Sequence, residues 1–247
     1  MKFIILTLFL LLTSFTNANS KTLNVLGVSL SGEKDDRNIR EYKIINLIFK
    51  CMGSDFKIEN VPYGRHLLLY NESKDYDVIT TVPPNEKLKG YKSNSHIKYI
   101  NGVSVLKDSK LNIRTLKDLK NLNVISFVGA SELIPEIKEN MKLFKSYNEI
   151  NDQESHSKLL FLGRADAVIS DGLIFQSYNM KLRQKEPSKK EFQKKTKFFH
   201  ILQPSKFSLY FKDKILVDKF NSCLKKEYIQ KKIDRINYQY LMDMIML

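Results

Sequence analysis

Tryptophan is absent from the 247-residue sequence, and cysteine, proline and glycine are scarce, with two, six and nine residues. Several short patterns with known chemistry are also missing: the His-Glu-x-x-His zinc helix, paired zinc-binding cysteines, the phosphate-binding loop and the Gly-x-Ser-x-Gly nucleophile turn. The histidines lie on different predicted elements without the spacing of metal ligands (His66, His96, His156 and His200). We therefore predict no metal and no cofactor, and the sequence gives little support for an enzyme.

Long apolar runs are missing after residue 20, where no stretch approaches the ~20 apolar residues of a membrane-spanning helix. One shorter apolar run, at 4–12, follows the positive charge of Lys2 and precedes small residues at 16–20. This order is typical of a secretory signal peptide and unusual for a buried N-terminal element. We predict a signal peptide at 1–20, cleaved after Ala18 or Ser20, and a soluble protein in the periplasm.

The charge is strongly positive, with 41 Lys and Arg against 27 Asp and Glu and a formal net charge of +14. Such a charge is common in proteins that bind nucleic acid. Here the lysines are scattered singly along the chain, except at 181–197, which indicates a compositional bias. Because an exported protein rarely meets nucleic acid, we predict no nucleic-acid partner and assign the charge to solubility and attraction of anions.

The two cysteines, Cys51 and Cys223, are far apart in the sequence. In an oxidising compartment they could form a disulfide, which would stabilise the fold by roughly 4–5 kcal/mol in the chain-entropy model. Each also lies on the apolar face of a predicted helix, where a free cysteine is a common small core residue. The sequence leaves both alternatives open.

Strand-like and helix-like patterns alternate in both halves of the chain. In the first half we expect strands at 22–28, 56–61 and 76–81 and helices at 37–52 and 64–70, with Gly53 ending the first helix. In the second half we expect strands at 123–128, 144–150 and 165–170 and helices from the 129–132 turn to Met141 and at 152–162. This order predicts an α/β protein with two lobes, each a mostly parallel sheet flanked by helices.

The remaining segments suit connections between the lobes. Extended runs at 97–106 and 198–203 are expected to cross between them, and the helical tail at 217–247 is expected to pack on the first lobe. The charged segment 180–195 is expected to be a solvated loop or a frayed helix. The predicted boundaries are 21–99 for the first part of lobe 1, 100–202 for lobe 2, and 203–247 for the return to lobe 1.

A near-repeat relates the two halves. Leu67–Tyr70, a polar turn and Asp77–Thr80 correspond to Leu159–Leu162, a turn and Asp166–Ser170. Both strands end in small hydroxyl residues. Ligands of open α/β sheets bind beyond the carboxyl ends of the strands, so we expect Thr80 and Thr81 to face a crevice shared with the second lobe.

Four segments carry a resemblance to a known family: Val61–Arg65, Tyr76–Thr81, Leu116–Val124 and Gly163–Asp171. In their order and separation they resemble the type II periplasmic solute-binding proteins, particularly the group that serves polar amino-acid ABC importers. The resemblance implies a monomer that binds a small polar solute, an amino acid or another small anion or zwitterion, between two lobes. Its partner would be an inner-membrane ABC importer or a sensor.

The resemblance also implies site residues. Backbone N–H groups and the hydroxyl at Gly129–Ser131 would receive a ligand carboxylate, and Asp171 would pair with a ligand ammonium. From the residues alone, Ser131 and Asp171 could instead cap the helices that follow them. Both interpretations stay open.

The sequence departs from the family where an arginine usually clamps the ligand carboxylate. Lys87 stands there, and its ammonium lacks the planar fork of arginine. Arg65 could supply a replacement cation or lie on the surface of a helix. Two other functions are therefore considered: an enzyme acting on a small carboxylate with Asp171 or Glu132 as acid or base, and a relative that binds no solute.

Overall fold

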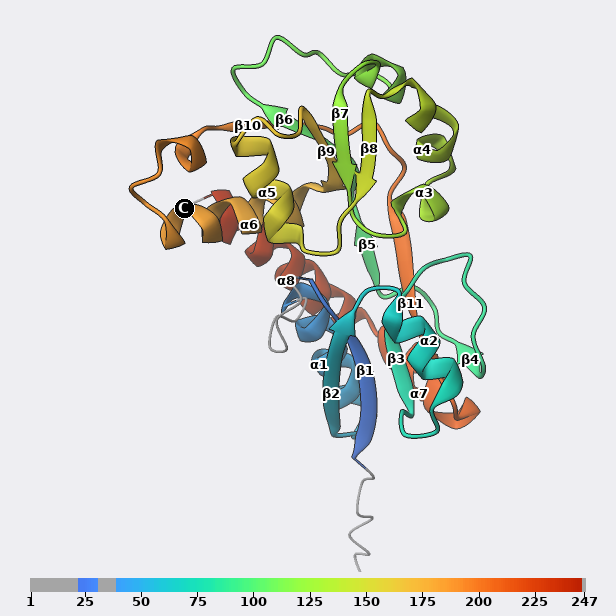
Figure 1. Cartoon of the computed structure of the whole chain (residues 1–247). Helices are drawn as coiled ribbons and strands as arrows, with labels where there is room; N and C mark the ends of the chain where they lie inside the picture. Colours follow the sequence, from blue (N-terminus) through green and yellow to red (C-terminus); the bar gives the residue numbers. More distant parts are fainter. Residues whose placement is uncertain (1–21, 31–38, 246–247) are drawn as a thin grey trace, which may run out of the picture.

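Two β-sheets, each with helices packed against it, form two lobes in the computed structural model, which describes residues 22–30 and 39–245 (Figure 1). The predicted two-lobed α/β fold is confirmed. The predicted signal peptide at 1–20 and most of the predicted loop at 29–36 lie outside the described residues. Within the described residues, no helix combines the length and the apolar character needed to cross a bilayer.

The first lobe contains a sheet with the strand order β2-β1-β3-β11-β4, and β5 also pairs with β11. Its strands are β1 (Leu23–Ser29), β2 (Phe56–Pro62), β3 (Val78–Val82), β4 (Tyr91–Lys92), β5 (Ile97–Tyr99) and β11 (Ser205–Phe211). Its helices are α1 (Ile39–Met52), α2 (Arg65–Glu72), α7 (Lys214–Leu224) and α8 (Glu227–Ile245). β1 runs parallel to β2 and β3, whereas β11 is antiparallel to β3. Because helices cover both faces of this sheet, β3 is buried along its whole length.

Helix α1 shows how the core of this lobe forms. Ile44, Ile45, Ile48 and Phe49 recur at helical spacing and are all buried against the sheet. The helix ends before Gly53, whose φ of 68° is the left-handed conformation predicted for it.

A disulfide between Cys51 and Cys223 connects α1 to α7, with the two Cα atoms 6.0 Å apart. This separation lies in the usual range for a disulfide. Of the two alternatives left open by the sequence, the structure therefore shows the cross-link.

The second lobe contains a sheet with the order β10-β6-β9-β7-β8. Its strands are β6 (Asn101–Leu106), β7 (Asn123–Ser126), β8 (Ser146–Glu149), β9 (Ala167–Asp171) and β10 (Thr196–Phe199). Its helices are η1 (Leu116–Leu119), α3 (Ala130–Leu133), α4 (Pro135–Asn140), η2 (Met141–Leu143), α5 (Gln153–Phe161), α6 (Gly172–Lys185) and η3 (Lys190–Gln193). β7 is parallel to β8 and β9, and β6 is antiparallel to β9.

One expectation for this lobe was wrong and another was partly right. The single helix expected from the 129–132 turn to Met141 is split at Ile134, whose extended backbone (φ −120°, ψ 94°) is what a following proline imposes.

The segment 180–195 was expected to be a solvated loop or a frayed helix. Its first residues, Met180–Lys185, form the last turns of α6, where Leu182 is fully buried beside the exposed Lys181, and the rest is irregular apart from η3.

The lobes are joined by two crossings. β5 ends at Tyr99 in the first sheet and β6 begins at Asn101 in the second, while the return runs between Phe199 and Ser205. Helix α8 packs its Ile229 and Ile233 in the first-lobe core, as predicted for the tail, and also contacts α6.

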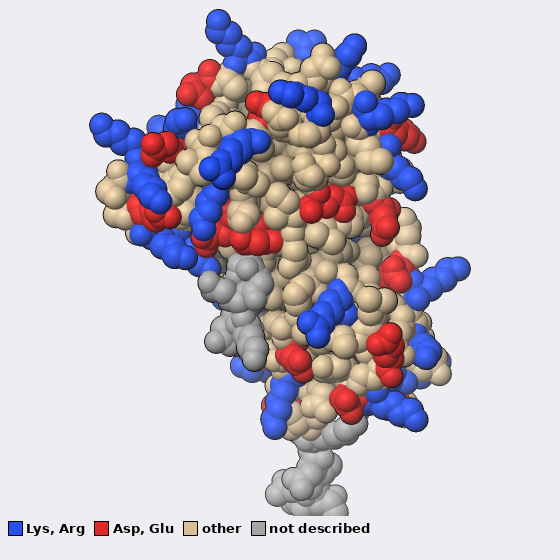
Figure 2. All heavy atoms as spheres, viewed as in Figure 1, with Lys and Arg blue, Asp and Glu red and all other residues tan. Residues whose placement is uncertain are grey.

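Charge is distributed unevenly over the two lobes. Lysine and arginine cover much of the surface, whereas Asp and Glu gather along the edge of the second lobe that faces the first (Figure 2). The junction between the lobes is therefore acidic on this face, although the net charge of the chain is +14.

Candidate functional site between the lobes

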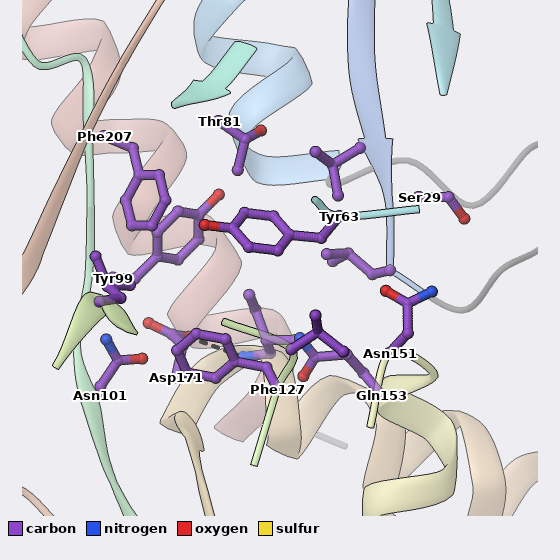
Figure 3. A pocket seen from close by; sticks show the side chains of 15 residues that line it. Ser29, Tyr63, Thr81, Tyr99, Asn101, Phe127, Asn151, Gln153, Asp171 and Phe207 are labelled. Carbon is purple, nitrogen blue, oxygen red and sulfur yellow. Dashed lines mark hydrogen bonds between the residues drawn. The ribbon is translucent and has the colours of Figure 1, made fainter. Parts of the chain in front are cut away.

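A cavity of about 60 Å³ lies between the two sheets (Figure 3). The first lobe lines it with Val28, Ser29, Leu30, Tyr63, Thr81, Tyr99 and Phe207, and the second lobe with Asn101, Phe127, Val128, Leu133, Asn151, Gln153, Asp171 and Ile174. This volume is well below the ~300 Å³ of small ligand pockets. The two lobes therefore lie close together around the cavity.

Direct contacts between the lobes account for the small volume. The backbone N–H of Gln153, at the start of α5, donates to the carbonyl oxygen of Leu30 at 3.1 Å. Leu133 packs against the cores of both lobes. These contacts hold the cavity closed along its rim.

The position of the cavity follows from the strand directions. Ser29 ends β1, Thr81 lies near the end of β3, and Asp171 ends β9. These are the carboxyl ends of parallel strands in the two sheets, where ligands of α/β proteins bind. The near-repeat predicts that the hydroxyl residues ending both strands face one crevice, but of these only Thr81 lines the cavity, because Thr80 and Ser170 are buried. Asp171, which the family resemblance indicated, lines the cavity from the opposite lobe.

Aromatic rings occupy much of the cavity wall. Tyr63 extends across the space toward Tyr99, between Phe207 and Phe127 (Figure 3). A Cβ atom built on Gly129 would lie 3.2 Å from the Tyr63 ring, so Tyr63 of the first lobe reaches the second. Gly129 also has a φ of 81°, which favours glycine.

The pKa of Tyr63 is raised, first by burial and then by the negative charges of Glu86, Glu132 and Glu149. Its phenol is therefore neutral at ordinary pH.

On the first lobe, the hydroxyl rim is bonded to a buried carboxylate. Thr81 donates its N–H to Oε1 of Glu41 at 3.2 Å and its hydroxyl to Oε2 at 2.6 Å, while Thr80 pairs with the Thr81 hydroxyl at 3.1 Å. Glu41 also contacts His96 Nε2 at 2.8 Å and the Tyr99 hydroxyl at 3.1 Å. Burial pushes the pKa of Glu41 up, but these partners outweigh it and the pKa is lowered.

On the second lobe, a carboxylate likewise occupies the turn predicted for the ligand. Gly129 and Ser131 donate their backbone N–H groups to the two oxygens of Glu149 at 2.7 and 2.8 Å, and the Tyr147 hydroxyl donates to Glu149 at 2.9 Å. The parallel register pairs Glu149 with Ser126, level with the end of β7, and so places it beside this turn. Partial burial acts to raise the pKa of Glu149, yet the donors lower it overall.

Asp171 fulfils the capping alternative and also lines the cavity. Its Oδ1 accepts from the N–H groups of Leu173 and Ile174 at 3.0 and 2.9 Å, which caps α6. Its Oδ2 accepts from Ile100 at 2.6 Å, the residue at which the chain crosses between the lobes. Burial raises the pKa of Asp171, opposed by the charge of Arg40 and by these N–H donors.

The remaining predicted residues lie elsewhere. Arg65 and Lys87 are exposed and neither lines the cavity, and Thr80 is buried behind Thr81. Arg40 is buried, but its guanidinium donates to the carbonyl of Lys98 and stacks on Tyr99 at 5.1 Å. Among the described residues, no Lys or Arg lines the cavity.

Several residues of the site were not singled out from the sequence: Glu41, Tyr63, Glu149, Asn151 and Gln153. Tyr63 lies within the Val61–Arg65 motif, and Glu41 falls on the apolar face of α1 beside Ile44 and Ile45, so both carried a usable signal. No feature of the sequence points to Glu149, because its contact with the Gly129–Ser131 turn depends on the register of β8 against β7. In the part of the chain that the structure describes, no group of three His, Cys, Asp or Glu side chains is arranged to hold a metal.

The comparisons with known proteins concern the fold. No family model and no curated protein matches the sequence. Solved structures match over nearly the whole chain. A probable amino-acid ABC transporter extracellular-binding protein of Bacillus subtilis is 19% identical, with a TM-score of 0.68, and the match covers 90% of this chain and 99% of that one.

Two further solved structures are similar in the same way. A histidine kinase sensor domain with similarity to periplasmic binding proteins is 12% identical, with a TM-score of 0.69 and coverage of 90% and 96%. An ancestral amino-acid-binding protein, described as a precursor of cyclohexadienyl dehydratase, is 17% identical, with a TM-score of 0.66 and coverage of 89% and 95%. The chain therefore has the periplasmic-binding-protein fold. Its structural neighbours include amino-acid ABC transporter substrate-binding proteins, as the resemblance in the sequence implies.

Proposed function

We propose that this protein binds a small polar solute between its lobes in the periplasm and delivers it to an ABC importer. The observation that carries the proposal is the cavity formed by strand ends of both lobes, with Thr81 on one side and Asp171 on the other. The amino-acid-binding proteins among the structural neighbours support a solute of that size, an amino acid or a similar small polar compound.

Solute entry requires the lobes to separate, because the closed cavity is too small for an amino acid. The two crossings, at Ile100 and at 200–204, are short and form the hinge of this motion. Separation breaks the bond between Gln153 and Leu30 and withdraws Tyr63 from Gly129. A solute that then binds across both lobes stabilises the folded chain in proportion to its concentration.

A thermal-shift screen of the mature chain, followed by calorimetry, tests this proposal. The panel contains amino acids, amines, small carboxylates, peptides and sugars. We expect one chemical class to raise the Tm, and Phe127→Ala to weaken that binding at least tenfold. Tyr238→Ala, on an exposed part of α8, serves as the matched control and should bind normally. If no compound in the panel raises the Tm, the proposal is contradicted.

One observation favours a second function. The donors at Thr81 and at the Gly129–Ser131 turn are bonded to carboxylates of the chain, and Gln153 joins the lobes at Leu30, which suits a sensory or solute-free module whose readout is a protein contact. The match to a sensor domain is compatible with it. X-ray scattering separates the two, since a solute-binding protein should change its radius of gyration with its solute and a solute-free module should not.

The structure offers less to the enzymatic alternative. Glu132 is exposed and does not line the cavity, and both oxygens of Asp171 are engaged by backbone N–H groups. Consumption of the bound compound during incubation would nevertheless replace the binding proposal by a catalytic one.

A further inference from the structure

Beside the cavity, two sets of N–H and hydroxyl donors, one at Thr81 and one at the turn next to Tyr63, are both occupied by carboxylates of the chain itself. Glu41 accepts the N–H and hydroxyl of Thr81, and Glu149 accepts the N–H groups of Gly129 and Ser131. A carboxylate on the solute would have to displace Glu149 or lie beside it. Because like charges repel and no described Lys or Arg lines the cavity, neither arrangement is favourable.

The rest of the cavity suits a positive charge. The rings of Tyr63, Tyr99, Phe127 and Phe207 line it, and aromatic rings can attract ammonium and guanidinium groups through their faces, as Tyr99 already does with Arg40. Asp171 places a carboxylate at its second-lobe side, although its oxygens already accept backbone N–H groups and the guanidinium of Arg40 offsets part of its charge. The lining therefore combines aromatic surface with one carboxylate and no cationic side chain.

An unused acceptor points in the same direction. The side-chain oxygen of Gln153 is buried at the cavity and makes no hydrogen bond with the described residues. A buried acceptor without a partner is costly, and an N–H donor on a solute would satisfy it. The side-chain oxygen of Gln153 therefore favours a solute group that donates a hydrogen bond over one that accepts it.

Carboxylates that lie outside the cavity also favour a cationic solute. Glu86, Glu132 and Glu149 all act on Tyr63, and acidic side chains gather where the second lobe faces the first (Figure 2). This acidic junction stands out on a chain with a net charge of +14. Local charge at a cleft, more than net charge, concentrates an ion of opposite sign there.

We propose that the solute is a cationic amine or guanidine without a carboxylate, and that Glu149 is the residue that rejects carboxylate-bearing analogues. The proposal rests on the proposed binding function and names its solute class. Glu149 acts by filling the N–H groups of the Gly129–Ser131 turn, so that a solute carboxylate finds no donor there.

Matched pairs of compounds that differ by one carboxylate test the inference: agmatine and arginine, cadaverine and lysine, histamine and histidine. Affinities are measured by calorimetry with the mature chain. We expect at least one amine to bind, and to bind at least tenfold more tightly than its amino acid. Glu149→Ala should free the turn and reduce that preference to threefold or less.

Two controls keep the result specific. Glu149→Gln retains hydrogen-bond acceptance without the charge and should give an intermediate preference, and it serves if the alanine variant folds poorly. Glu191→Ala removes an exposed carboxylate of the same lobe and should leave the preference unchanged.

The outcomes separate the inference from the proposed function. If the wild-type chain binds an amino acid more tightly than its amine, or if Glu149→Ala keeps the full preference, the inference fails while solute binding stands. If no amine binds but another class does, the inference fails in the same way. If nothing in the wider panel binds, both fail.

Discussion

In each lobe a carboxylate accepts backbone N–H groups near the end of a strand, but the two carboxylates lie at different depths. Glu41, on α1, is 2% exposed and has Thr81, His96 and Tyr99 as partners inside the first lobe. Glu149, at the end of β8, is only partly buried and accepts from the Gly129–Ser131 turn. This difference in depth gives the first carboxylate a structural role and leaves the second accessible for the role in solute selection proposed above.

Removing the deeper carboxylate should have the largest effect on stability. Glu41→Ala leaves the Thr81 N–H and the side chains of His96 and Tyr99 without their partner in a dry environment. Breaking such a buried network costs about 3–5 kcal/mol of the free energy of unfolding. Urea unfolding monitored by circular dichroism measures it, and a loss below about 1 kcal/mol would contradict the structural role.

The disulfide is the next difference between the lobes, because it cross-links α1 and α7 of the first lobe and the second lobe has no cysteine. The Cys51→Ala, Cys223→Ala double variant should lose about 2–4 kcal/mol of stability. Solute binding should be unchanged, since neither residue lines the cavity. Added reductant should destabilise the wild type and leave the double variant unaffected.

Each lobe contains a fully buried histidine, so the dependence of stability on pH gives a further comparison of the two lobes. Burial lowers the pKa of His66 in the first lobe and of His156 in the second to about 4, from 6.5. The unfolded chain takes up these protons near pH 6.5 and the folded chain only near pH 4. Stability is therefore fully present above pH 6.5 and falls as the pH drops from 6.5 through 4.

The expected loss is about 1–3 kcal/mol per histidine across this window. Denaturant midpoints at pH 7 and pH 4.5 measure it, with His66→Gln and His156→Gln as the variants. Each substitution should flatten the decline by a similar amount. A variant with an unchanged slope would show that its histidine already titrates normally in the folded chain.

How far the sequence could predict these features depends on the range of the interactions. The apolar spacing of α1 and the strand and helix order are local, and they predicted the two lobes and the position of Thr81 at a crevice between them. A helix after Asp171 was only one of two alternatives, and the extent of α6 to Lys185 was not predicted, because Lys181 and its charged neighbours concealed the apolar positions Tyr178 and Leu182. β11 was not predicted either, because it is placed by antiparallel pairing with β3 and β5, over 100 residues away.

The contact of Glu149 with Gly129 could not be predicted from the sequence, and the reason is a different one. It depends on the register of β8 against β7, which pairs Glu149 with Ser126. A shift of one residue would turn Glu149 to the other face of the sheet. The sequence shows the turn and shows the carboxylate, but only tertiary structure brings them together.

The smallest expected effect on stability is that of Glu149→Ala, and its small size is what distinguishes the two lobes. The N–H groups of Gly129 and Ser131 lose their acceptor in a partly exposed position, where water can replace it, so the loss should be about 1 kcal/mol. The partly exposed position of Glu149 makes this cost lower than that of Glu41→Ala by at least about 2 kcal/mol, even though both carboxylates accept backbone N–H groups. Urea unfolding of the two variants in parallel measures the difference. Equal losses would mean that both carboxylates serve the fold alone, and the solute-facing role of Glu149 would then have to be abandoned.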